Sequence, residues 1–421
     1  MKRESTAIEI VSIGEELLSG ATLDTNAATI AQALEPLGLR VVRRTTVGDD
    51  AASIADAVAS ALARTGVVIT TGGLGPTNDD TTKAAVAGVF GRPLEFREEL
   101  WAGLKERWAR RGRIPETNRR QAEVPAGAEV FPNPRGTAPG LAMEDERLGL
   151  CILLPGPPAE VQALVRGAIV PFLAGRQASG EAARPFRRQL RTSGVAESAI
   201  AERVAGRLGD LALDVAYLPE VDGVDIRLTG WASDEAEVAG RLDEAVERLR
   251  EILGLHVYAE GARDLAQVVG DLLRERGVTV AVAESCTAGL IARRLTEFPG
   301  SSDYFWGGMI VYDDRAKVEL LGVSEETLRR HGAVSEETAR EMAEGACRCS
   351  GSAAAIAVTG IAGPAGGTEE KPVGTVWLAV RLKDKTVAKR RYYPGTRDMV
   401  RVRAAQGGLD LLRRTLLQGQ R

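Results

Sequence analysis

Residues 281–290 read AVAESCTAGL, and this stretch decides how the C-terminal third of the chain folds. The apolar run at 278–282, rich in β-branched residues, predicts a buried strand, and we expect a helix to begin at Cys286. Ser285 and Thr287 would then lie at a strand-to-helix junction, where the N–H groups of the first helical turn are free. A serine there either caps the helix or attacks a carbonyl group while those N–H groups bind the oxyanion.

Length and composition restrict the class of protein. The 421 residues are too many for one core and predict two or three domains. A net charge of −4 gives no electrostatic reason to expect a nucleic-acid partner. No run approaches the roughly 20 apolar residues of a membrane span, and the start, MKRESTAIEI, lacks a signal-peptide core. We therefore expect a cytoplasmic protein that binds neither nucleic acid nor membrane directly.

Histidine is scarce, which restricts the chemistry. The sequence contains two histidines, His256 and His331, compared with 58 acidic residues and 54 lysines and arginines. Because histidine is the usual general base, hydrolysis here would depend on lysine, carboxylate or metal. Cys286 is a competing nucleophile, since a helix N-terminus lowers the pKa of a cysteine.

The N-terminal part alternates strands and helices. Residues 7–14, 41–47 and 67–71 are predicted strands, and helices are expected from about 24 to 37 and over 51–64. This alternation is typical of a parallel sheet with helices on both faces. Ligands of such sheets lie beyond the carboxyl ends of the strands, where the third strand breaks into a glycine loop.

That glycine loop combines residues suited to bind a diphosphate. Glycines let backbone amides approach a phosphate, a threonine adds a hydroxyl and a lysine adds a charge. Two aspartates either hold a hard divalent cation that bridges phosphates or merely begin the next helix, where acidic residues suit the dipole. Two further Gly/Pro loops, at 133–140 and 154–160, are expected to line the same site. The loop residues are Gly72, Gly73, Gly75, Thr77, Asp79, Asp80 and Lys83.

Small polar residues at 174–184 predict a linker to a compact α+β unit. A GXXG sequence at 206–209 mimics a nucleic-acid clamp. However, residues 184–256 hold 10 arginines against 14 acidic residues, a net charge of −4 that is wrong for binding phosphate backbones. We interpret the unit as a spacer or dimerisation domain. Its predicted elements are a strand at 186–192, a helix at 196–208, a hairpin at 222–223, a helix at 233–253 and a strand at 255–259.

The C-terminal third places a lysine near the end of a second strand. The strand at 307–312 ends in Tyr312, Asp313 or Asp314 can cap the following helix, and Lys317 lies in its first turns. A lysine shielded by the apolar residues at 318, 320 and 321 can lose its proton near neutral pH and act as a base. The alternative is a solvated lysine on a helix surface.

Another strand, at 354–359, ends in Thr359 and the small-residue sequence GIAGPAGGT, which suits a phosphate or a ribose. Arg397 and Arg401 lie four apart on one helix face. They either clamp a phosphate or lie on the surface as ordinary solvated arginines.

The motifs IGEELLSG, DTNA, VGDD, TTGGLGPTNDDTT, NPRGTAPG and LPGPPAE resemble the CinA (competence/damage-inducible protein A) family. The resemblance implies a molybdopterin-binding-like N-terminal domain associated with metal-dependent ADP-ribose pyrophosphatase activity, followed by a small KH-like domain. It implies a nucleotide site made by Asn26, the glycine loop and Lys83, and a divalent metal ion held by Asp80 with Asp79.

The motifs AESCTAG, HGAVSEET, TGIAGPAGGT, EEKPVGTVW and PGTR are similar to the C-terminal domain of the same family, and to PncC-type nicotinamide mononucleotide deamidases. The family usually reads TGG where this chain has TAG, and we expect activity to survive the added methyl group. The resemblance implies a Ser285 nucleophile, a Lys317 base, Tyr312 assisting proton transfer, and Thr359 in the amide or oxyanion pocket. It implies substrate binding by Thr287, Gly289, Gly363, Gly366, Gly367 and Arg397.

We therefore expect an α/β chain of three domains, at 1–174, 184–259 and 260–421. The expected reaction converts nicotinamide mononucleotide and water to nicotinic acid mononucleotide and ammonia by a serine–lysine mechanism without a cofactor. ADP-ribose hydrolysis with a divalent metal ion is the second activity. The alternative is a non-catalytic nucleotide-binding accessory factor in competence or recombination. The resemblance also implies a homodimer.

Overall fold

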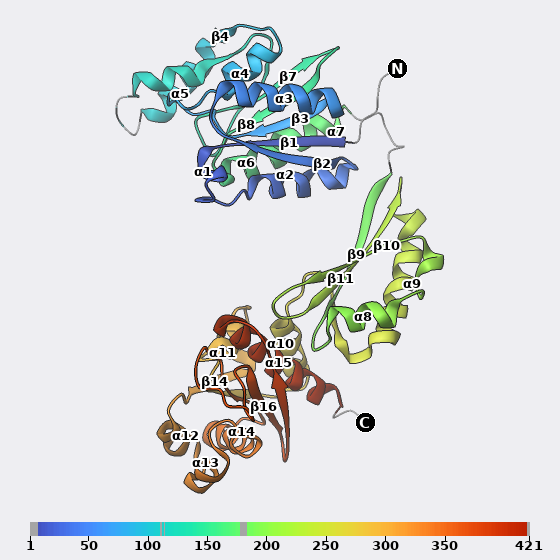
Figure 1. Cartoon of the computed structure of the whole chain (residues 1–421), viewed down its shortest axis with the longest axis vertical. Coiled ribbons are helices and arrows are strands. Elements are labelled where there is room, and N and C mark those ends of the chain that lie inside the picture. The colour runs from blue at the N-terminus through green and yellow to red at the C-terminus, as the bar shows by residue number, and fades with distance from the viewer. Residues whose placement is uncertain (1–6, 110–111, 113, 177–182, 419–421) are drawn as a thin grey trace. The chain divides into compact units, whose positions relative to one another are not determined.

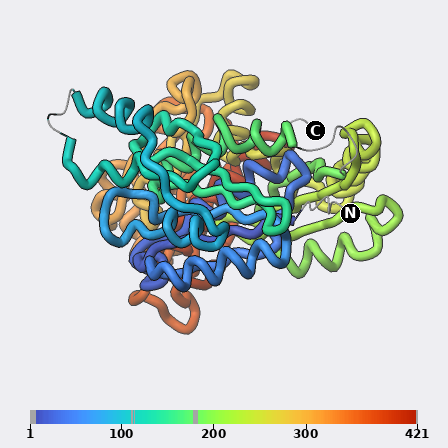
Figure 2. Tube along the Cα trace, turned by 90° about the horizontal axis from the view of Figure 1, so that it is seen from above, coloured from blue at the N-terminus to red at the C-terminus, as the bar shows by residue number. Residues whose placement is uncertain are grey.

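A computed structural model describes residues 7–109, 112, 114–176 and 183–418. The chain divides into two compact units, one of Met1–Pro185 with Trp231–Glu237 and the other of Phe186–Gly230 with Val238–Arg421. Figure 1 labels the elements, and Figure 2 traces the same chain from above. The predicted linker at 174–184 falls mostly outside the described residues. No helix in the described ranges is both long and apolar enough to cross a membrane.

A six-stranded sheet in the order β2-β1-β3-β8-β7-β6 is the framework of the first unit. Its first four strands run parallel; β1, β2 and β3 were predicted, whereas β8 beside β3 was not. β7 and β6 add an antiparallel edge that the sequence patterns did not indicate either. The strands are β1 (Ala7–Ile13), β2 (Arg40–Val47), β3 (Val67–Thr71), β6 (Glu129–Phe131), β7 (Gly140–Asp145) and β8 (Gly149–Leu154), and a separate pair is β4 (Leu94–Phe96) with β5 (Glu123–Pro125).

Helices cover both faces of this sheet (Figure 1). Successive side chains of a strand alternate between faces, so Ile8 and Ile10 of β1 pack against one helical layer and Val11 and Ile13 against the other. The helices are α1 (Glu15–Leu18), α2 (Asn26–Leu34), η1 (Glu35–Leu37), α3 (Ala51–Thr65), α4 (Thr82–Val89), α5 (Glu98–Trp108), η2 (Glu116–Ala122), α6 (Pro158–Leu164), η3 (Val165–Ile169) and α7 (Val170–Ala174).

The second unit begins with a four-stranded sheet in the order β10-β11-β9-β12, which forms the small middle domain. The hairpin predicted at 222–223 joins the antiparallel strands β10 and β11. The predicted helix at 196–208 is shorter than expected, because α8 ends at Val204 and Gly206 adopts a left-handed φ of 70°. The elements are β9 (Arg184–Thr192), α8 (Glu197–Val204), η4 (Gly209–Leu211), β10 (Asp214–Pro219), β11 (Val224–Ala232), α9 (Ala236–Leu253), η5 (Gly254–His256) and β12 (Val257–Glu260).

A five-stranded sheet in the order β14-β13-β15-β16-β17 completes the second unit. β13 lies between two parallel neighbours, β14 and β15, while β16 and β17 continue the sheet antiparallel. The predicted α/β class is thus confirmed for this part as well. The strands are β13 (Val280–Glu284), β14 (Phe305–Ile310), β15 (Ala354–Gly360), β16 (Thr375–Leu382) and β17 (Lys385–Tyr392).

Two helical layers enclose this sheet (Figure 1). Val280 and Val282 of β13 pack against α10, α11 and α15, whereas Ala281 and Ala283 pack against α12 and α14. The small alanines let the second layer approach the sheet closely. The helices are α10 (Leu265–Glu275), α11 (Leu290–Thr296), η6 (Ser301–Asp303), α12 (Asp314–Leu321), α13 (Glu325–His331), α14 (Glu336–Ser350) and α15 (Arg397–Gln418).

The close approach of α14 to α12 gives a first testable prediction. A Cβ atom on Gly345 would lie 2.0 Å from the carbonyl oxygen of Leu321, at the end of α12. We expect Gly345→Ala to lower the free energy of unfolding by about 1–3 kcal/mol, because the overpacking outweighs the better helix propensity of alanine.

Gly240 in α9 is the matched control, since a Cβ atom there would meet no atom within 4 Å. Gly240→Ala should raise the free energy of unfolding by about 0.5–1 kcal/mol. Urea unfolding of the full chain followed by circular dichroism measures both. A stabilised Gly345→Ala variant would contradict the close packing of α14 on α12.

Candidate functional site

The carboxyl ends of β13, β14 and β15 bring the predicted catalytic residues to one edge of the C-terminal sheet. Glu284, the last residue of β13, pairs with Ile310 of β14 and with Val358 of β15. The Ser285 amide continues this register by donating to the Val358 carbonyl oxygen at 3.0 Å. Ser285 and Thr359 therefore lie beside each other at the ends of adjacent strands.

The alternation of side chains places Ser285 and Thr359 on one face of the sheet. Ser285 lies two and four residues after Ala283 and Ala281, so its side chain points to the same face of the sheet as theirs. These alanines pack against α12 and α14. Thr359 is 1% exposed, and its hydroxyl donates to the Ala333 carbonyl oxygen at 2.7 Å. The layer that carries Lys317, on α12, therefore covers the same face as the two hydroxyl groups.

Lys317 is buried, so the alternative of a solvated surface lysine is wrong. Its side chain is 1% exposed, and its Nζ donates to the Tyr312 carbonyl oxygen at 3.2 Å and to Asp314 Oδ1 at 3.0 Å. The apolar shielding predicted from the sequence is only partly present, because Leu321 is buried but Leu320 is 51% exposed. The sequence indicated Asp314 only as a candidate helix cap, and its ion pair with Lys317 was not predicted.

The turn after β13 differs from the prediction. A helix does not begin at Cys286, because residues 285–289 form a turn and α11 starts only at Leu290. Ser285 therefore does not cap a helix. Ala288 and Gly289 adopt left-handed φ values of 49° and 92°, which reverse the chain before the helix.

Glu284 explains how this turn is held. Its side chain is fully buried, and its carboxylate accepts hydrogen bonds from the amides of Gly289 at 3.0 Å, Ile291 at 3.1 Å and Ala292 at 2.8 Å. The prediction that the first helical amides are free to bind an oxyanion is therefore wrong, since Glu284 occupies them. This role of Glu284 was not predicted, although a carboxylate ending an apolar strand was a usable signal.

Two amides of the turn still suit an oxyanion. The Ala288 amide donates to the Ser285 carbonyl oxygen and the Leu290 amide to the Thr287 carbonyl oxygen. Within the described part of the chain, the amides of Cys286 and Thr287 donate to no protein acceptor. These two N–H groups follow Ser285 directly, so they are the candidate oxyanion donors.

Arginines of α15 reach this turn from the other helical layer. Arg397 donates to the Tyr312 hydroxyl at 3.1 Å and to the Gly363 carbonyl oxygen at 2.8 Å. Arg401 donates to the Thr287 carbonyl oxygen at 3.2 Å. Tyr312, Gly363 and Thr287 are thus joined to one helix, and both guanidinium groups have partners at the site, although Arg397 is exposed.

The glycine loop after β15 is folded back on itself. A Cβ atom on Gly363 would lie 2.5 Å from Val373 Cγ1, and one on Gly367 would lie 2.7 Å from the Val373 amide nitrogen. Gly366 lies between them with a φ of 93°. This loop brings its backbone close to Arg397 through Gly363, as the predicted substrate cradle requires.

Cys286 differs from the reactive thiol that the sequence suggested. It is 4% exposed, and burial raises the pKa of its thiol to about 12. The expected lowering by a helix N-terminus is absent because no helix begins at this residue. Ser285 therefore has no competitor with thiolate character in the turn.

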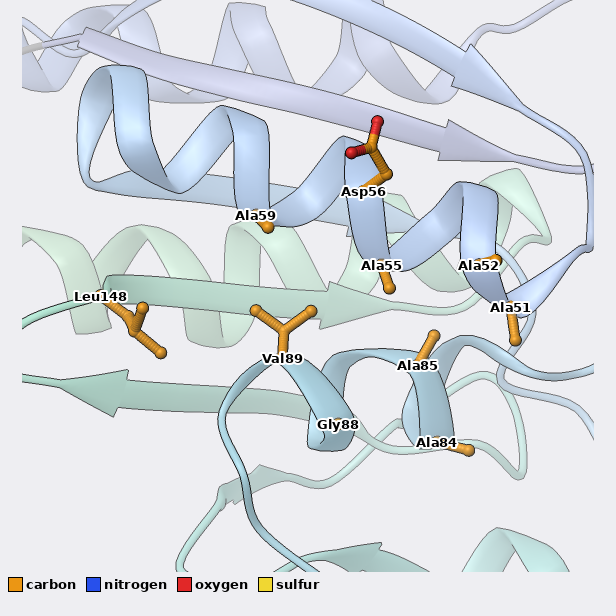
Figure 3. A pocket seen from close by; sticks show the side chains of 10 residues that line it. All are labelled: Ala51, Ala52, Ala55, Asp56, Ala59, Ala84, Ala85, Gly88, Val89 and Leu148. Carbon is orange, nitrogen blue, oxygen red and sulfur yellow. The ribbon is translucent and has the colours of Figure 1, made fainter.

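A polar cleft of about 420 Å³ lies on the same side of the sheet as Thr359. Trp377 of β16, which pairs with Thr359, lines the cleft together with His331, Ser335 and Lys371. Ser285, Lys317 and Thr359 are not among the residues that line this cleft. In the N-terminal unit, a groove of about 670 Å³ between α3 and α4 is lined mainly by alanines, and Asp56 is the one charged residue among those that line it (Figure 3). It carries no catalytic chemistry.

In the N-terminal unit, Asp80 holds the glycine loop together. Its Oδ1 accepts from the Gly75 amide at 2.7 Å, and its Oδ2 accepts from the Thr77 amide at 2.7 Å and the Thr77 hydroxyl at 2.6 Å. The residues at 7–109, 112, 114–176 and 183–418 include no cluster of three or more His, Cys, Asp or Glu side chains that could hold a metal ion. The carboxylate of Asp80 is already hydrogen-bonded within the loop, and a metal ion held by Asp80 with Asp79 remains a prediction.

Lys83 and Asn26 are also engaged within the protein. Lys83 is 6% exposed, its Nζ donates to the carbonyl oxygens of Arg120 and Glu123, and burial lowers the pKa of its amine to about 8. The expectation that this lysine presents a free charge to a phosphate is therefore wrong. Asn26 Nδ2 donates to Thr71 Oγ1 at 3.0 Å and to the Gly156 carbonyl oxygen at 2.7 Å, and joins two of the expected loops.

Gly72 and Gly73 turn the chain at the end of β3. Their φ values are 109° and 67°, and a Cβ atom on either would lie 2.1 Å from a neighbouring oxygen. Only glycine fits such an approach. The glycines therefore form the tight turn that the sequence predicts. The charged residues Asp80 and Lys83, however, bind groups of the protein.

Three protein-family models match successive parts of the chain. The model described as "Probable molybdopterin binding domain" matches residues 9–175, "Damage-inducible protein CinA KH domain" matches 187–259, and "CinA C-terminal domain" matches 262–416. A CinA-like protein of Gemmatimonas aurantiaca is 48% identical over 415 residues, which cover 97% of this chain and 96% of the relative. A CinA-like protein of Chloroherpeton thalassium is 41% identical over 421 residues, covering 97% and 99%.

Solved structures match a smaller part of the chain. A competence/damage inducible protein from Agrobacterium tumefaciens is 43% identical, covers 37% of this chain and 94% of that chain, and has a TM-score of 0.36.

The burial of Cys286 gives the second prediction. With a pKa of about 12, only about one thiol in 10⁴ is ionised at pH 8. We expect iodoacetamide at pH 8 to label the exposed Cys349 and to leave Cys286 unlabelled until the chain is unfolded in guanidinium chloride. Peptide mass spectrometry measures both. Labelling of Cys286 at the rate of Cys349 in the folded protein would contradict the buried position of this thiol in the turn.

Proposed function

The chain belongs to the CinA family of competence/damage-inducible proteins, and from this membership and the site geometry we propose that its C-terminal domain is an amidohydrolase. Its substrate is nicotinamide mononucleotide, and its products are nicotinic acid mononucleotide and ammonia. The observation that carries the proposal is the buried Lys317 amine, on the sheet face that also presents Ser285 and Thr359. A buried amine on the same sheet face as a hydroxyl nucleophile suits serine–lysine acyl transfer.

The reaction proceeds through an acyl-enzyme. In this mechanism the Lys317 amine accepts the proton of the Ser285 hydroxyl as its oxygen attacks the amide carbon. The step requires Lys317 to leave its ion pair with Asp314 as a neutral amine, because an ammonium group has no lone pair to accept a proton. The negative charge that develops on the carbonyl oxygen is stabilised by the amides of Cys286 and Thr287. The C–N bond then breaks, ammonia leaves with the proton returned by Lys317, and water hydrolyses the ester by the same route. This chemistry needs no cofactor.

Other residues of the site hold the substrate. Arg397 binds the phosphate next to the backbone of Gly363 and the rest of the glycine loop, and a bidentate guanidinium suits this role. The Tyr312 hydroxyl, which accepts a hydrogen bond from Arg397, assists proton transfer. Thr359 is placed beside Ser285 by strand register and lines the pocket for the amide.

A second activity is proposed for the N-terminal unit, which binds ADP-ribose at the glycine loop. The supporting observation is Asn26, which joins Thr71 and Gly156 at two loop ends while its own Oδ1 has no partner. Glycine amides and this oxygen can bind a diphosphate and a ribose. Metal-dependent hydrolysis of the bound ADP-ribose, with Asp79 and Asp80 contributing ligands beside the substrate phosphates, remains a prediction from the family resemblance.

The alternative to both activities is a non-catalytic accessory factor in competence or recombination. The model of the middle domain is described as damage-inducible, other relatives are named "Putative competence-damage inducible protein", and none of these names states a reaction. Ammonia release separates the alternatives, because an accessory factor binds nucleotide without turnover. The homodimer expected from the family resemblance remains a prediction.

Deamidation should depend on Ser285 and Lys317. We expect Ser285→Ala to lower kcat/KM at least about 10³-fold, because it removes the nucleophile. Lys317→Arg should be nearly as inactive, because a guanidinium stays protonated and cannot accept the serine proton. A coupled glutamate dehydrogenase assay of ammonia release measures all variants.

Cys286→Ala is the control for the nucleophile and should keep most of the activity. If Cys286→Ala were inactive and Ser285→Ala active, the serine assignment would be refuted. Near-normal activity of Lys317→Arg would mean that the residue supplies only positive charge. A wild-type protein that binds the mononucleotide without releasing ammonia would support the accessory factor.

The N-terminal proposal predicts that ADP-ribose binding requires the intact glycine loop. Asp80→Ala removes the acceptor of three hydrogen bonds from Gly75 and Thr77, so we expect ADP-ribose affinity to fall at least about tenfold. Titration calorimetry with and without magnesium measures the affinity, and unchanged deamidation is the control. Absence of binding in the wild type under both conditions would contradict the site.

A further inference from the structure

Helix α15 begins at the proposed deamidase site but is held along its length by the middle domain. The β10–β11 hairpin supplies the first contact, because Arg403 Nε donates to the Val221 carbonyl oxygen at 3.0 Å. Arg403 Nη1 also donates to the Pro394 carbonyl oxygen at 2.6 Å, in the segment just before α15. One guanidinium group thus fixes the hairpin tip and the start of the helix to each other.

A buried ion cluster on α15 forms the second contact. Asp410 is 6% exposed, and its Oδ1 accepts from Arg413 Nε at 3.0 Å and from Arg413 Nη2 at 2.7 Å. Its Oδ2 accepts from Arg414 Nε at 2.7 Å. Residues three and four apart on a helix lie on one face, so one carboxylate can orient both guanidinium groups.

Both arginines extend from this cluster to the middle domain. Arg413 Nη2 donates to the carbonyl oxygen of Leu255. Arg414 Nη2 donates to the Ser193 carbonyl oxygen at 3.2 Å and lies 3.2 Å from His256 Nδ1. A buried charged group lowers the stability of the protein unless each of its partners is in place. The contacts of Arg413 and Arg414 therefore require a fixed position of the middle domain against α15, which a flexible spacer would not need.

The other end of α15 carries the arginines of the site. Arg397 contacts Tyr312 and Gly363, and Arg401 contacts Thr287. From Arg397 to Arg403 the helix rises about 9 Å, so these contacts share one rigid element with the hairpin contact. A shift or loosening of α15 at Arg403 or Asp410 therefore displaces both guanidinium groups at the site.

We propose that the middle domain is a positioning element of the proposed deamidase site. It fixes α15 through the hairpin tip and the Asp410 cluster, and α15 in turn fixes Arg397 and Arg401 against the substrate. The inference rests on the proposed function for its kinetic consequence, whereas its structural consequence is independent of any activity. Asp410, Arg403 and Arg414 are positioning residues, because none is placed against the substrate or the reacting atoms.

Two variants of the full chain test the proposal. Asp410→Asn weakens the acceptor of both arginines, and Arg403→Gln removes the guanidinium that binds Val221. We expect each to raise KM for nicotinamide mononucleotide about 5–20-fold with kcat within about twofold, since substrate positioning changes and the Ser285–Lys317 chemistry does not. A merely structural defect would instead lower the active fraction, and so kcat, at constant KM.

Arg248→Gln is the matched control. Arg248 pairs with Asp210 and Glu244, all within the middle domain. Like Arg403→Gln, this variant loses one guanidinium group, but the two partners of Arg248 are carboxylates within the middle domain. It should leave KM and kcat unchanged. A rise in KM for Arg248→Gln equal to that of Arg403→Gln would overturn the proposal, because the effect would then not depend on contact with α15.

Hydrogen–deuterium exchange separates a failure of this proposal from a failure of the proposed function. Amides in the first two turns of α15 should exchange at least about tenfold faster in Asp410→Asn and Arg403→Gln than in the wild type and Arg248→Gln. This readout needs no substrate. If exchange in α15 is unchanged in both folded variants, the positioning role is overturned, whether or not the wild type releases ammonia.

Discussion

The proposed deamidase site depends on one buried carboxylate. Glu284 ends β13, which lies between β14 and β15, and accepts amide hydrogen bonds from Gly289, the last residue of the nucleophile turn, and from Ile291 and Ala292 of α11. A carboxylate without these donors would cost several kcal/mol to bury, so turn and helix must stay where the donors converge. Ser285, next to Glu284, therefore has little freedom to move.

The two helical layers contribute different parts of the chemistry because strand side chains alternate. Glu284 and the α15 arginines lie on one side, where they shape the turn and its substrate contacts. Ser285, Thr359 and Lys317 belong to the other side, where alanines let α12 and α14 approach the sheet closely. The turn 285–289 is where the two layers meet, so a single substrate can contact both.

Sequence patterns predicted what depends on local periodicity. Strands such as β3 (Val67–Thr71) follow from their apolar runs. Three features were missed because they depend on contacts that form only in the folded chain. Lys83 donates to carbonyl oxygens 37 and 40 residues away. Glu284, and not a capping serine, binds the amides of Ile291 and Ala292 at the start of α11, and the ion pair of Lys317 requires a folded α12.

The acidic middle domain can be understood from the same geometry. Its 10 arginines and 14 acidic residues make it unsuited to nucleic acid, and the sequence alone therefore suggested a spacer or a dimerisation domain. Yet the acceptors it offers to α15 are the carbonyl oxygens of Val221, Leu255 and Ser193, which do not appear in a charge count. The matching charges lie on α15, in the neighbouring domain. A domain that binds arginines through backbone carbonyl oxygens needs those acceptors in the right positions. Its net charge then does not indicate which element it binds.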